Sequence, residues 1–238
     1  MEDKGIGLSI VIPAYNEERT IGAAIDEVIA HVISVVPSAE IILVDDGSVD
    51  ATGRIASGRA AADPRIRYLR QENAGHGPAV YAGLGAARGD SVLLLDSDCQ
   101  IALGDFDAHW KDFDGRDALL GIRMPRYDGW HRTILSLMMK GLVSILFRVS
   151  PIDAGTPFKL VRMKHWIAAK QWIDPSNPIP AVLLAIYLVN NGGDVAQRRV
   201  IHRPRLGSVS TLKPMRLLKF CSAGASAIAR FRSAASWG

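Results

Sequence analysis

Leu93-Leu94-Leu95-Asp96-Ser97-Asp98 is an apolar run that ends in two carboxylates separated by one residue. A short apolar run of this kind is typical of a strand buried in a parallel sheet. Where the chain leaves the strand, both carboxylates can turn toward one crevice, and a hard divalent cation relieves their repulsion. Oxygen ligands favour Mg²⁺ or Mn²⁺ over Zn²⁺, and such a cation can bridge a diphosphate. Two surface aspartates that merely follow a strand are the alternative interpretation.

The alternation of strands and helices around this run predicts the fold class. Strands are predicted over 8–12, 41–44, 66–69, 91–95 and 118–122, and helices over 21–33, 52–59 and 77–87. This order predicts an α/β fold with a mostly parallel central sheet flanked by helices. Beyond residue 125 the pattern is weaker, with helices expected over 132–148, 179–190 and 214–231 and a strand over 195–201.

Two further polar clusters follow predicted strands. Asp45-Asp46-Gly47-Ser48 combines a glycine that permits a tight turn with carboxylates that can accept hydrogen bonds from a base or a ribose; a plain turn is the alternative. In Pro13-Ala14-Tyr15-Asn16-Glu17-Glu18, Tyr15 can stack on a nucleobase and Glu17 can accept from it, whereas Asn16 is also a typical helix cap. Ligands bind outside the carboxyl ends of parallel strands, so these clusters predict one site.

Four stretches in register resemble glycosyltransferase family 2, in its branch of polyprenyl-phosphate and dolichyl-phosphate glycosyltransferases. They are Ser9-Ile-Val-Ile-Pro-Ala-Tyr-Asn-Glu-Glu18, Val44-Asp-Asp-Gly-Ser48, Asn73-Ala-Gly-His-Gly77 and Leu95-Asp-Ser-Asp-Cys-Gln100. The resemblance covers residues 7–210 and implies a single GT-A (Rossmann-like) catalytic domain over 1–210. It also implies an inverting transfer of a sugar from a UDP- or GDP-linked donor to a polyprenyl phosphate.

The resemblance implies roles for individual positions on the donor side. The residues that it places around the nucleotide and its diphosphate are Pro13, Tyr15, Glu17, Asp45, Asp96, Lys159, Arg205 and Ser210. Asp96, Asp98 and Gln100 are the residues that it places at Mg²⁺ or Mn²⁺. Ser208 stands in the basic loop 202–210 where the family commonly has glycine.

On the acceptor side, the resemblance places Arg132 and Ser136 at the acceptor phosphate. Gly121-Ile122-Arg123 looks like the family's Gly-x-Arg. Asp153-Ala-Gly-Thr-Pro-Phe-Lys159 resembles a segment near the reacting centre, with Pro157 in place of the usual glycine. Asp98, Arg123, Arg132, Ser136 and Asp153 are therefore the candidate catalytic residues.

The chemistry of a phosphate acceptor predicts a mechanism without reference to the family. A phosphate monoester has a second pKa of about 6, so it is already a competent nucleophile at neutral pH. A strong general base is then unnecessary. Arg123, Arg132 and Arg205 would orient two anionic substrates, and Asp153 would orient a reacting group. The expected course is in-line displacement with inversion at the anomeric carbon.

The charge distribution predicts a second phosphate-seeking region. No acidic residue follows Asp194, whereas nine arginines and lysines do. Such a run seeks phosphate on a substrate or on a lipid surface, unless it is a solvated face. The segment 211–238 is predicted to be basic and amphipathic, with Met215 to Phe220 and Ile228 to Phe231 at a membrane surface. Core packing is expected for the apolar stretch 134–147. A net charge of +4 alone does not argue for nucleic acid.

The remaining features bear on location. Cys99 and Cys221 form no metal or disulfide pattern, the N-terminus lacks the build of a signal peptide, and no apolar run reaches about 18 residues. We therefore expect a cytoplasmic protein in peripheral contact with the inner face of the cytoplasmic membrane.

Several alternatives stay open or are rejected on the sequence. A saccharide or lipid-linked saccharide acceptor and a catalytically inactive scaffold stay open. A nucleotidyltransferase would need a basic glycine-rich loop after its first strand, and a phosphatase would carry its Asp-x-Asp pair there. The run from Gly83 to Gly89 has the wrong spacing for a dinucleotide fingerprint. His76 is interpreted as a turn residue, with nucleotide contact as the alternative.

Overall fold

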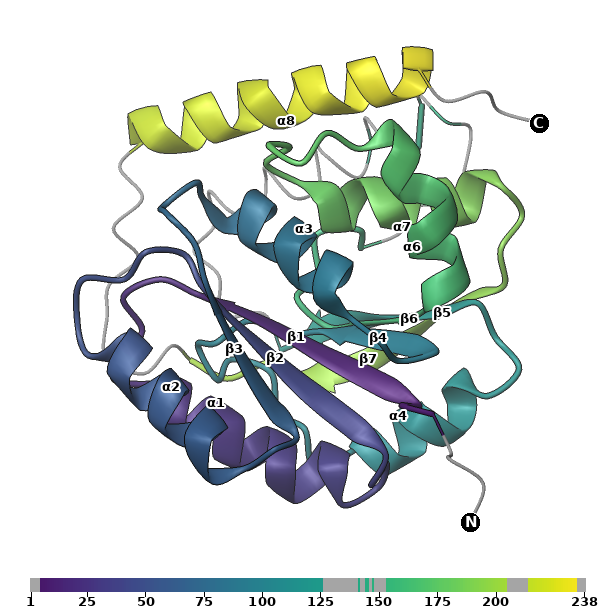
Figure 1. The fold of residues 1–238 in the computed structure, drawn as a ribbon. Helices are drawn as coiled ribbons and strands as arrows, with labels where there is room; N and C mark the ends of the chain where they lie inside the picture. Colours follow the sequence, from purple (N-terminus) through teal and green to yellow (C-terminus); the bar gives the residue numbers. More distant parts are fainter. Residues whose placement is uncertain are drawn as a thin grey trace.

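The computed structural model describes residues 5–125, 141, 144, 145, 147, 153–204 and 214–234. Within these residues, seven strands form one sheet in the order β3-β2-β1-β4-β6-β5-β7 (Figure 1). The strands are β1 (Leu8–Ala14), β2 (Ala39–Asp45), β3 (Ile66–Arg70), β4 (Ser91–Leu94), β5 (Ala118–Met124), β6 (Lys159–Arg162) and β7 (Val195–Ile201). β6 runs antiparallel to β4 and β5, while the other neighbours pair in parallel. The predicted α/β fold with a mostly parallel sheet is confirmed.

Helices cover both faces of the sheet. One face carries α1 (Ile21–Val28), α2 (Thr52–Ala62) and α4 (Phe106–Phe113), and the other carries α3 (His76–Ala86), α6 (Met163–Ala169) and α7 (Pro180–Asn190). A π-helical turn (Ile29–Ile33) extends α1, and a 3₁₀ turn (Lys170–Trp172) follows α6. The helix α8 (Pro214–Ala234) lies across the second face as an outer layer (Figure 1).

The core explains the long apolar runs of the central strands. All seven residues of β1 and of β2 are buried, because helices lie above and below them. Leu8, Ile10 and Ile12 face the cluster beneath α1 and α4, whereas Val11 faces the cluster beneath α3 and α7. Gly83 lies inside α3, and a Cβ there would come 2.3 Å from Cγ1 of Val11. This glycine therefore serves close packing of a helix on β1, and not a dinucleotide.

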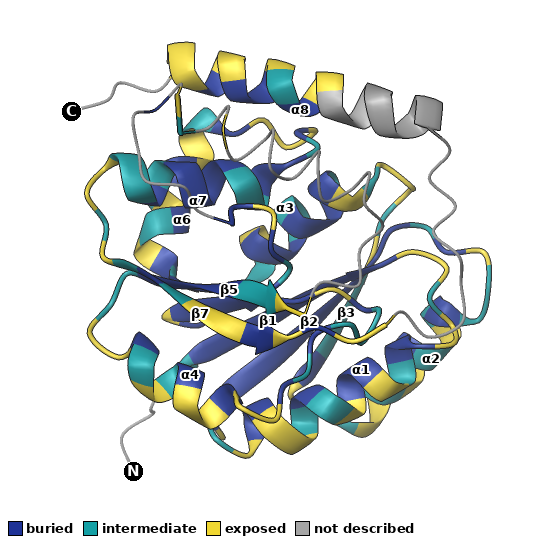
Figure 2. Ribbon diagram, turned by 180° about the vertical axis from the view of Figure 1, so that it is seen from behind, coloured by how far each residue is buried: buried dark blue, intermediate teal, exposed yellow. Residues whose placement is uncertain are grey.

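The C-terminal helix corrects one prediction. Ile228 and Phe231, expected at a membrane surface, are buried in the core cluster that also contains Ile179 and Trp166. For residues 222–234 of α8, Figure 2 shows the inner side buried against the layer of α7 and the outer side exposed. The side chains of 214–221 and the stretch 126–140 lie outside the described residues. Within the described part of the chain, no helix is both long and apolar enough to span a membrane.

Candidate functional site

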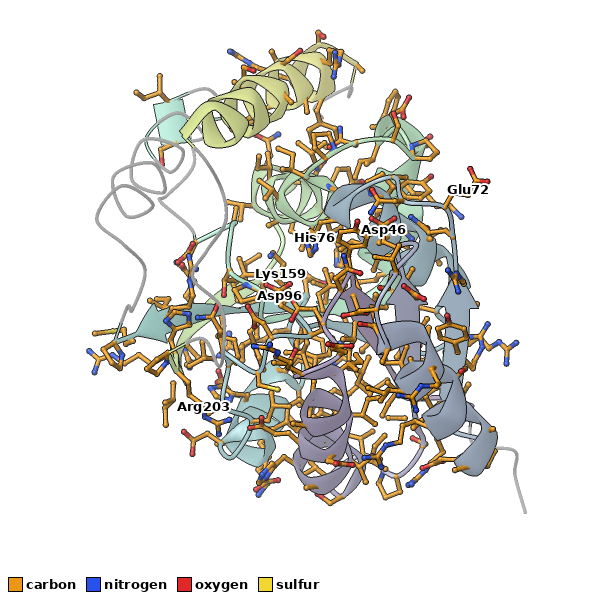
Figure 3. The ribbon with its side chains drawn as sticks, turned by 90° about the vertical axis from the view of Figure 1, so that its left-hand side faces the viewer. Asp46, Glu72, His76, Asp96, Lys159 and Arg203 are labelled. Atoms are coloured by element: carbon orange, nitrogen blue, oxygen red, sulfur yellow. The ribbon has the colours of Figure 1, made fainter. Side chains whose placement is uncertain are left out.

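The polar clusters meet at the carboxyl ends of β1, β2 and β4, as predicted. Ala14 pairs with Asp45 at the ends of β1 and β2, and Val11 pairs with Leu94 at the end of β4. The loops that begin at Tyr15, Asp46 and Leu95 therefore leave the sheet side by side. Figure 3 shows Asp46, His76, Asp96 and Lys159 gathered at this edge.

Hydrogen bonds join the loops after β1 and β2. The backbone N–H of Asn16 donates to Oγ of Ser48 (3.0 Å), and Oδ1 of Asn16 accepts from the N–H of Val49 (2.9 Å). The N–H of Glu17 donates to Oγ1 of Thr52 (2.7 Å). Asn16 therefore connects two loops instead of capping α1, and its positive φ of 53° belongs to this turn. Tyr15, next to it, is 47% exposed and so offers an aromatic surface at the site.

Asp45 is buried beneath these loops. Its Oδ1 accepts from the N–H of Ser48 (2.8 Å), and its Oδ2 accepts from the hydroxyl of Tyr68 (2.7 Å). Burial works to raise the pKa of Asp45, but the hydrogen bonds from Ser48 and Tyr68 outweigh it and hold that pKa below its usual value. Asp45 is therefore a carboxylate at neutral pH, with its charge held by protein donors.

Asp46 has a different part in the site from Asp45. Its carboxylate accepts from Nε2 of Gln71 (2.7 Å) and from the N–H groups of Ala74 (2.9 Å) and Gly75 (2.8 Å). The side chain is buried, so it holds the loop between β3 and α3 and is closed to a base or a ribose. This loop leads to His76, whose Nε2 lies 4.0 Å from Oδ1 of Asp96.

Asp96, Asp98 and Gln100 follow β4 in one loop. Asp96 is exposed and Asp98 is half-buried, and Oδ1 of Asp98 accepts from the N–H of Gln100 (3.1 Å). Nε2 of Gln100 donates to the carbonyl of Arg203 (3.2 Å), which leaves its Oε1 as the atom available to a cation. The intervening Cys99 has a positive φ of 56°, its Sγ donates to the carbonyl of Thr20 (3.5 Å), and burial raises its thiol pKa to about 11.

These residues fit a hard cation that shares its ligands with a substrate. Among the described residues, no group of three or more His, Cys, Asp or Glu could hold a metal ion. Two carboxylates and one amide oxygen would supply part of an octahedral shell. Mg²⁺ typically binds one or two carboxylates and completes its shell with phosphate oxygens and water. The donor set therefore suits a cation that arrives with a diphosphate.

A buried lysine adds positive charge beside this loop. Lys159, at the start of β6, is 3% exposed, and its Nζ donates to the carbonyl of Thr156. Burial lowers the pKa of Lys159 to about 8, while the carboxylates of Asp96 and Asp153 act against that shift and Arg123 acts with it. Asp96, Arg123 and Asp153, predicted together with Lys159 from three segments, therefore lie within electrostatic reach of this lysine.

The other predicted site residues have mixed outcomes. Pro13 is buried within β1. Arg132, Ser136, Arg205 and Ser210 lie outside the described residues.

Part of the basic C-terminal run pairs with carboxylates of the protein, because Arg198 pairs with Asp112 and Arg203 pairs with Glu27. The sequence interpretation missed Glu27 and the anchoring part of Asp46, and it favoured a turn role for His76.

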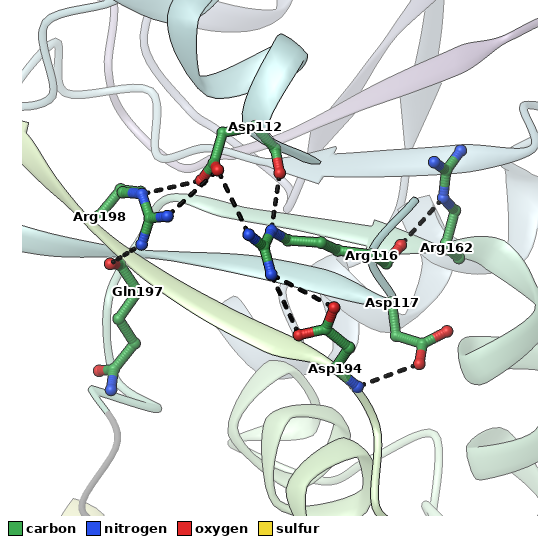
Figure 4. Close-up of polar contacts among 7 residues, drawn as sticks. All are labelled: Asp112, Arg116, Asp117, Arg162, Asp194, Gln197 and Arg198. Atoms are coloured by element: carbon green, nitrogen blue, oxygen red, sulfur yellow. Dashed lines mark hydrogen bonds and ion pairs between the residues drawn. The ribbon is translucent and has the colours of Figure 1, made fainter. Parts of the chain in front are cut away.

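A pocket of about 560 Å³ lies at the opposite edge of the sheet. It is lined by the residues before β4 and β5 and after β6, including Asp90, Asp117 and Lys164. Asp117 pairs with Lys164 and His165. Figure 4 shows Arg116 paired with Asp112 and Asp194. These charges offset one another within the protein, and the pocket lies away from the carboxyl edge. The candidate functional site is therefore the one at the carboxyl ends of β1, β2 and β4.

The family model that matches this chain is described as Glycosyl transferase family 2, and it matches residues 9–167. Dodecaprenyl-phosphate galacturonate synthase from Rhizobium johnstonii is 32% identical over 213 residues, which cover 87% of this chain and 62% of that protein. Undecaprenyl-phosphate 4-deoxy-4-formamido-L-arabinose transferase from Edwardsiella ictaluri is 33% identical over 159 residues, 65% of this chain and 49% of that protein. The chain thus spans less than two thirds of these relatives.

Solved structures share the fold. Glucosyl-3-phosphoglycerate synthase from Mycobacterium tuberculosis, in complex with Mn²⁺, uridine diphosphate and phosphoglyceric acid, has a TM-score of 0.68 to this chain. The two chains are 19% identical, and the match covers 98% of this chain and 80% of the synthase. A complex of the same enzyme with Mg²⁺ and uridine diphosphate also has a TM-score of 0.68, at 18% identity.

Proposed function

The chain belongs to glycosyl transferase family 2 and has the GT-A fold, and from this premise we propose that it moves a sugar from a nucleotide-diphosphate sugar to a polyprenyl phosphate. The observation that carries the proposal is the position of Asp96, Asp98 and Gln100 in one loop, with Tyr15 on the neighbouring loop and the buried Lys159 within electrostatic reach. The acceptor class follows the relatives, whose names specify dodecaprenyl or undecaprenyl phosphate.

The donor would lie along the carboxyl edge of the sheet. Tyr15 would stack on the nucleobase and Glu17 would accept a hydrogen bond from it, while the buried Asp45, through Ser48, and Pro13 would support the floor of this pocket. The diphosphate would lie toward Lys159, whose buried ammonium lacks the competition of bulk water and so attracts phosphate strongly. Arg205 and Ser210 would complete the contacts to the diphosphate.

Asp96, Asp98 and Gln100 are the proposed ligands of Mg²⁺ or Mn²⁺. When bound, the cation would neutralise charge that develops on the departing nucleoside diphosphate. The site supports this choice because all three side chains offer oxygen.

The acceptor phosphate would attack the anomeric carbon without a strong base. Its second pKa of about 6 makes it largely dianionic at neutral pH. Arg123, with Arg132 and Ser136, would hold the phosphate in line with the bond to the leaving group, which offsets repulsion between two anionic substrates. Attack from the face opposite the nucleotide inverts the anomeric configuration. Asp153, which is buried and within electrostatic reach of Lys159, would orient a reacting group.

A polyprenyl acceptor requires contact with a membrane, and α8 supplies a basic surface for it. Arg230 and Arg232 are exposed on this helix, and no acidic residue follows Asp194. Since Ile228 and Phe231 are buried in the core, their side chains would not insert, and electrostatic attraction to anionic lipids would supply the contact. We therefore place residues 1–210 as the catalytic domain and 211–238 as the segment at the inner face of the cytoplasmic membrane.

Nucleotide release by the purified protein tests the proposal. UDP- and GDP-sugars would be supplied with Mn²⁺ or Mg²⁺, with and without a short polyprenyl phosphate. We expect release of one nucleotide that depends on the lipid, is lost in Asp98→Ala and is retained in Asp107→Asn, a surface control on α4. Binding without lipid-stimulated release would favour a saccharide acceptor. Absence of metal-dependent nucleotide binding would contradict the assignment as an enzyme and favour the scaffold.

A further inference from the structure

Glu27 on α1 holds two distant segments at the edge of the site. Its side chain is 15% exposed, and each carboxylate oxygen has a partner. Oε1 accepts from the N–H of Leu103 (3.0 Å), directly after the loop that carries Asp98 and Gln100. Oε2 accepts from Nη1 of Arg203 (3.0 Å), beyond the end of β7. One carboxylate therefore fixes the exit of the Asp98 loop and the start of the basic loop 202–210.

The two segments that Glu27 holds are also joined to each other. The N–H of Arg203 donates to the carbonyl of Gln100 (2.7 Å), and the N–H of Ala102 donates to the carbonyl of Ile201 (2.9 Å). Ile101 and His202 form an antiparallel bridge between these bonds. Residues 100–103 and 201–203 thus form a short two-stranded ribbon. Glu27 on α1 contacts one residue of each strand, Leu103 and Arg203.

The ribbon determines which way the Gln100 amide faces. Nε2 of Gln100 donates to the carbonyl of Arg203 (3.2 Å), so the opposite atom of the amide, Oε1, is turned away from the ribbon. Arg203 is in turn joined to α1 by the ion pair between its guanidinium and Glu27. The ribbon continues from Ile201 of β7, which pairs with Met124 of β5, and Glu27 supplies the contact that joins the ribbon to α1.

We propose that Glu27 is a positioning residue for donor binding: through Arg203 it sets the Gln100 amide for the cation that accompanies the diphosphate. The inference rests on the proposed function, because it concerns the same donor site. Glu27 does not itself touch the donor. Its effect is on affinity, since partners that orient metal ligands typically change metal affinity by about 10- to 100-fold when they are removed.

Glu27→Gln tests the proposal with little change of shape. The amide keeps an acceptor for Leu103 but loses the ion pair with Arg203. Asp26→Asn is the matched control, because Asp26 is the adjacent residue on α1 and pairs with Arg59 on the outer surface, where it is 57% exposed. Calorimetric titration with Mn²⁺ and UDP or GDP, whichever nucleotide the wild type binds, measures the effect without turnover, and steady-state kinetics measure donor KM and kcat.

We expect Glu27→Gln to weaken Mn²⁺-dependent nucleotide binding and to raise donor KM by about 10-fold, with kcat within about twofold of wild type. Its melting temperature should stay within about 3 °C, and Asp26→Asn should match wild type throughout. Affinity equal to that of Asp26→Asn, or a joint loss of stability, kcat and affinity, would overturn the proposal. Since calorimetry needs no acceptor, failure of polyprenyl phosphate as a substrate would contradict the proposed function and leave this measurement intact.

Discussion

Nε2 of His76 lies 4.0 Å from Oδ1 of Asp96, although the two residues come from different loops of the sheet edge. His76 is the first residue of α3. Asp46 holds the loop that leads to it by accepting hydrogen bonds from Gln71, Ala74 and Gly75. Both side chains of the pair are accessible, at 60% and 41% exposure. His76 therefore presents a ring nitrogen beside a carboxylate that we propose as a ligand of the cation at the donor diphosphate.

Replacing His76 should weaken donor binding. A hydrogen bond to a charged group contributes about 1.5–3 kcal/mol, so His76→Ala is expected to raise donor KM by about 10-fold or more at neutral pH. The melting temperature should change little, because the side chain is exposed. His31→Ala removes another exposed histidine far from the site and should leave KM unchanged. Equal KM values for the two variants would exclude a donor contact by His76.

Lys159→Met should separate stability from binding. Because burial lowers the pKa of Lys159 to about 8, the charged form is penalised in the folded protein at pH 7. The unfolded chain binds more protons than the folded one from about pH 8 up to the ordinary lysine value, so wild-type stability should rise with pH through that window.

Methionine fills a similar volume without the charge, so the free energy of unfolding at pH 7 should stay equal or increase by up to about 2 kcal/mol. Nucleotide affinity should fall in the same variant. Chemical denaturation and calorimetric titration measure the two quantities. A less stable Lys159→Met with unchanged nucleotide affinity would show that the lysine serves the fold and not the diphosphate.

Asp117 should control stability in acid. Hydrogen bonds from Lys164 and His165 hold the pKa of Asp117 well below its ordinary value. The stabilisation is therefore present above the unfolded value of about 3.9 and is lost as the pH falls below it. Asp117→Asn should cost about 1–3 kcal/mol at pH 7 and should flatten the fall in stability between about pH 5 and pH 3.

Urea denaturation across that pH range measures the slope of stability against pH, with Asp107→Asn on the surface of α4 as the control. If the slope for Asp117→Asn equals that of wild type, the contacts of Asp117 with Lys164 and His165 do not set the acid limit.

Local patterns predicted the parts of the fold that depend on local sequence. β1, β2 and β4 are mostly apolar, and the carboxylates at or after their ends lie at the expected edge. β6 was not predicted, because Lys159-Leu-Val-Arg162 has a charge at each end and no room for alternation. It forms a strand because it fills the gap between β4 and β5, a condition that no local pattern records.

Long-range pairing accounts for what the sequence interpretation missed. Glu27 lies on an amphipathic helix and contacts Arg203, its partner 176 residues away. Arg198 likewise meets Asp112 from a distance of 86 residues. The sequence therefore predicted that the basic C-terminal run is available to bind phosphate, whereas the structure pairs Arg198 and Arg203 with carboxylates of the protein. Ile228 and Phe231 were assigned to a membrane because their partners on α6 and α7 could not be identified from periodicity alone.

The mass of the lipid product tests the central claim most directly. Purified protein would be incubated with a nucleotide sugar, Mn²⁺ and a polyprenyl phosphate, and the extracted lipid would be analysed by mass spectrometry. We expect a gain of one glycosyl residue on the original phosphate, absent in Asp98→Ala and present in Asp107→Asn. A gain of a sugar phosphate, or an unchanged lipid beside released nucleotide, would contradict transfer of the sugar to the acceptor phosphate.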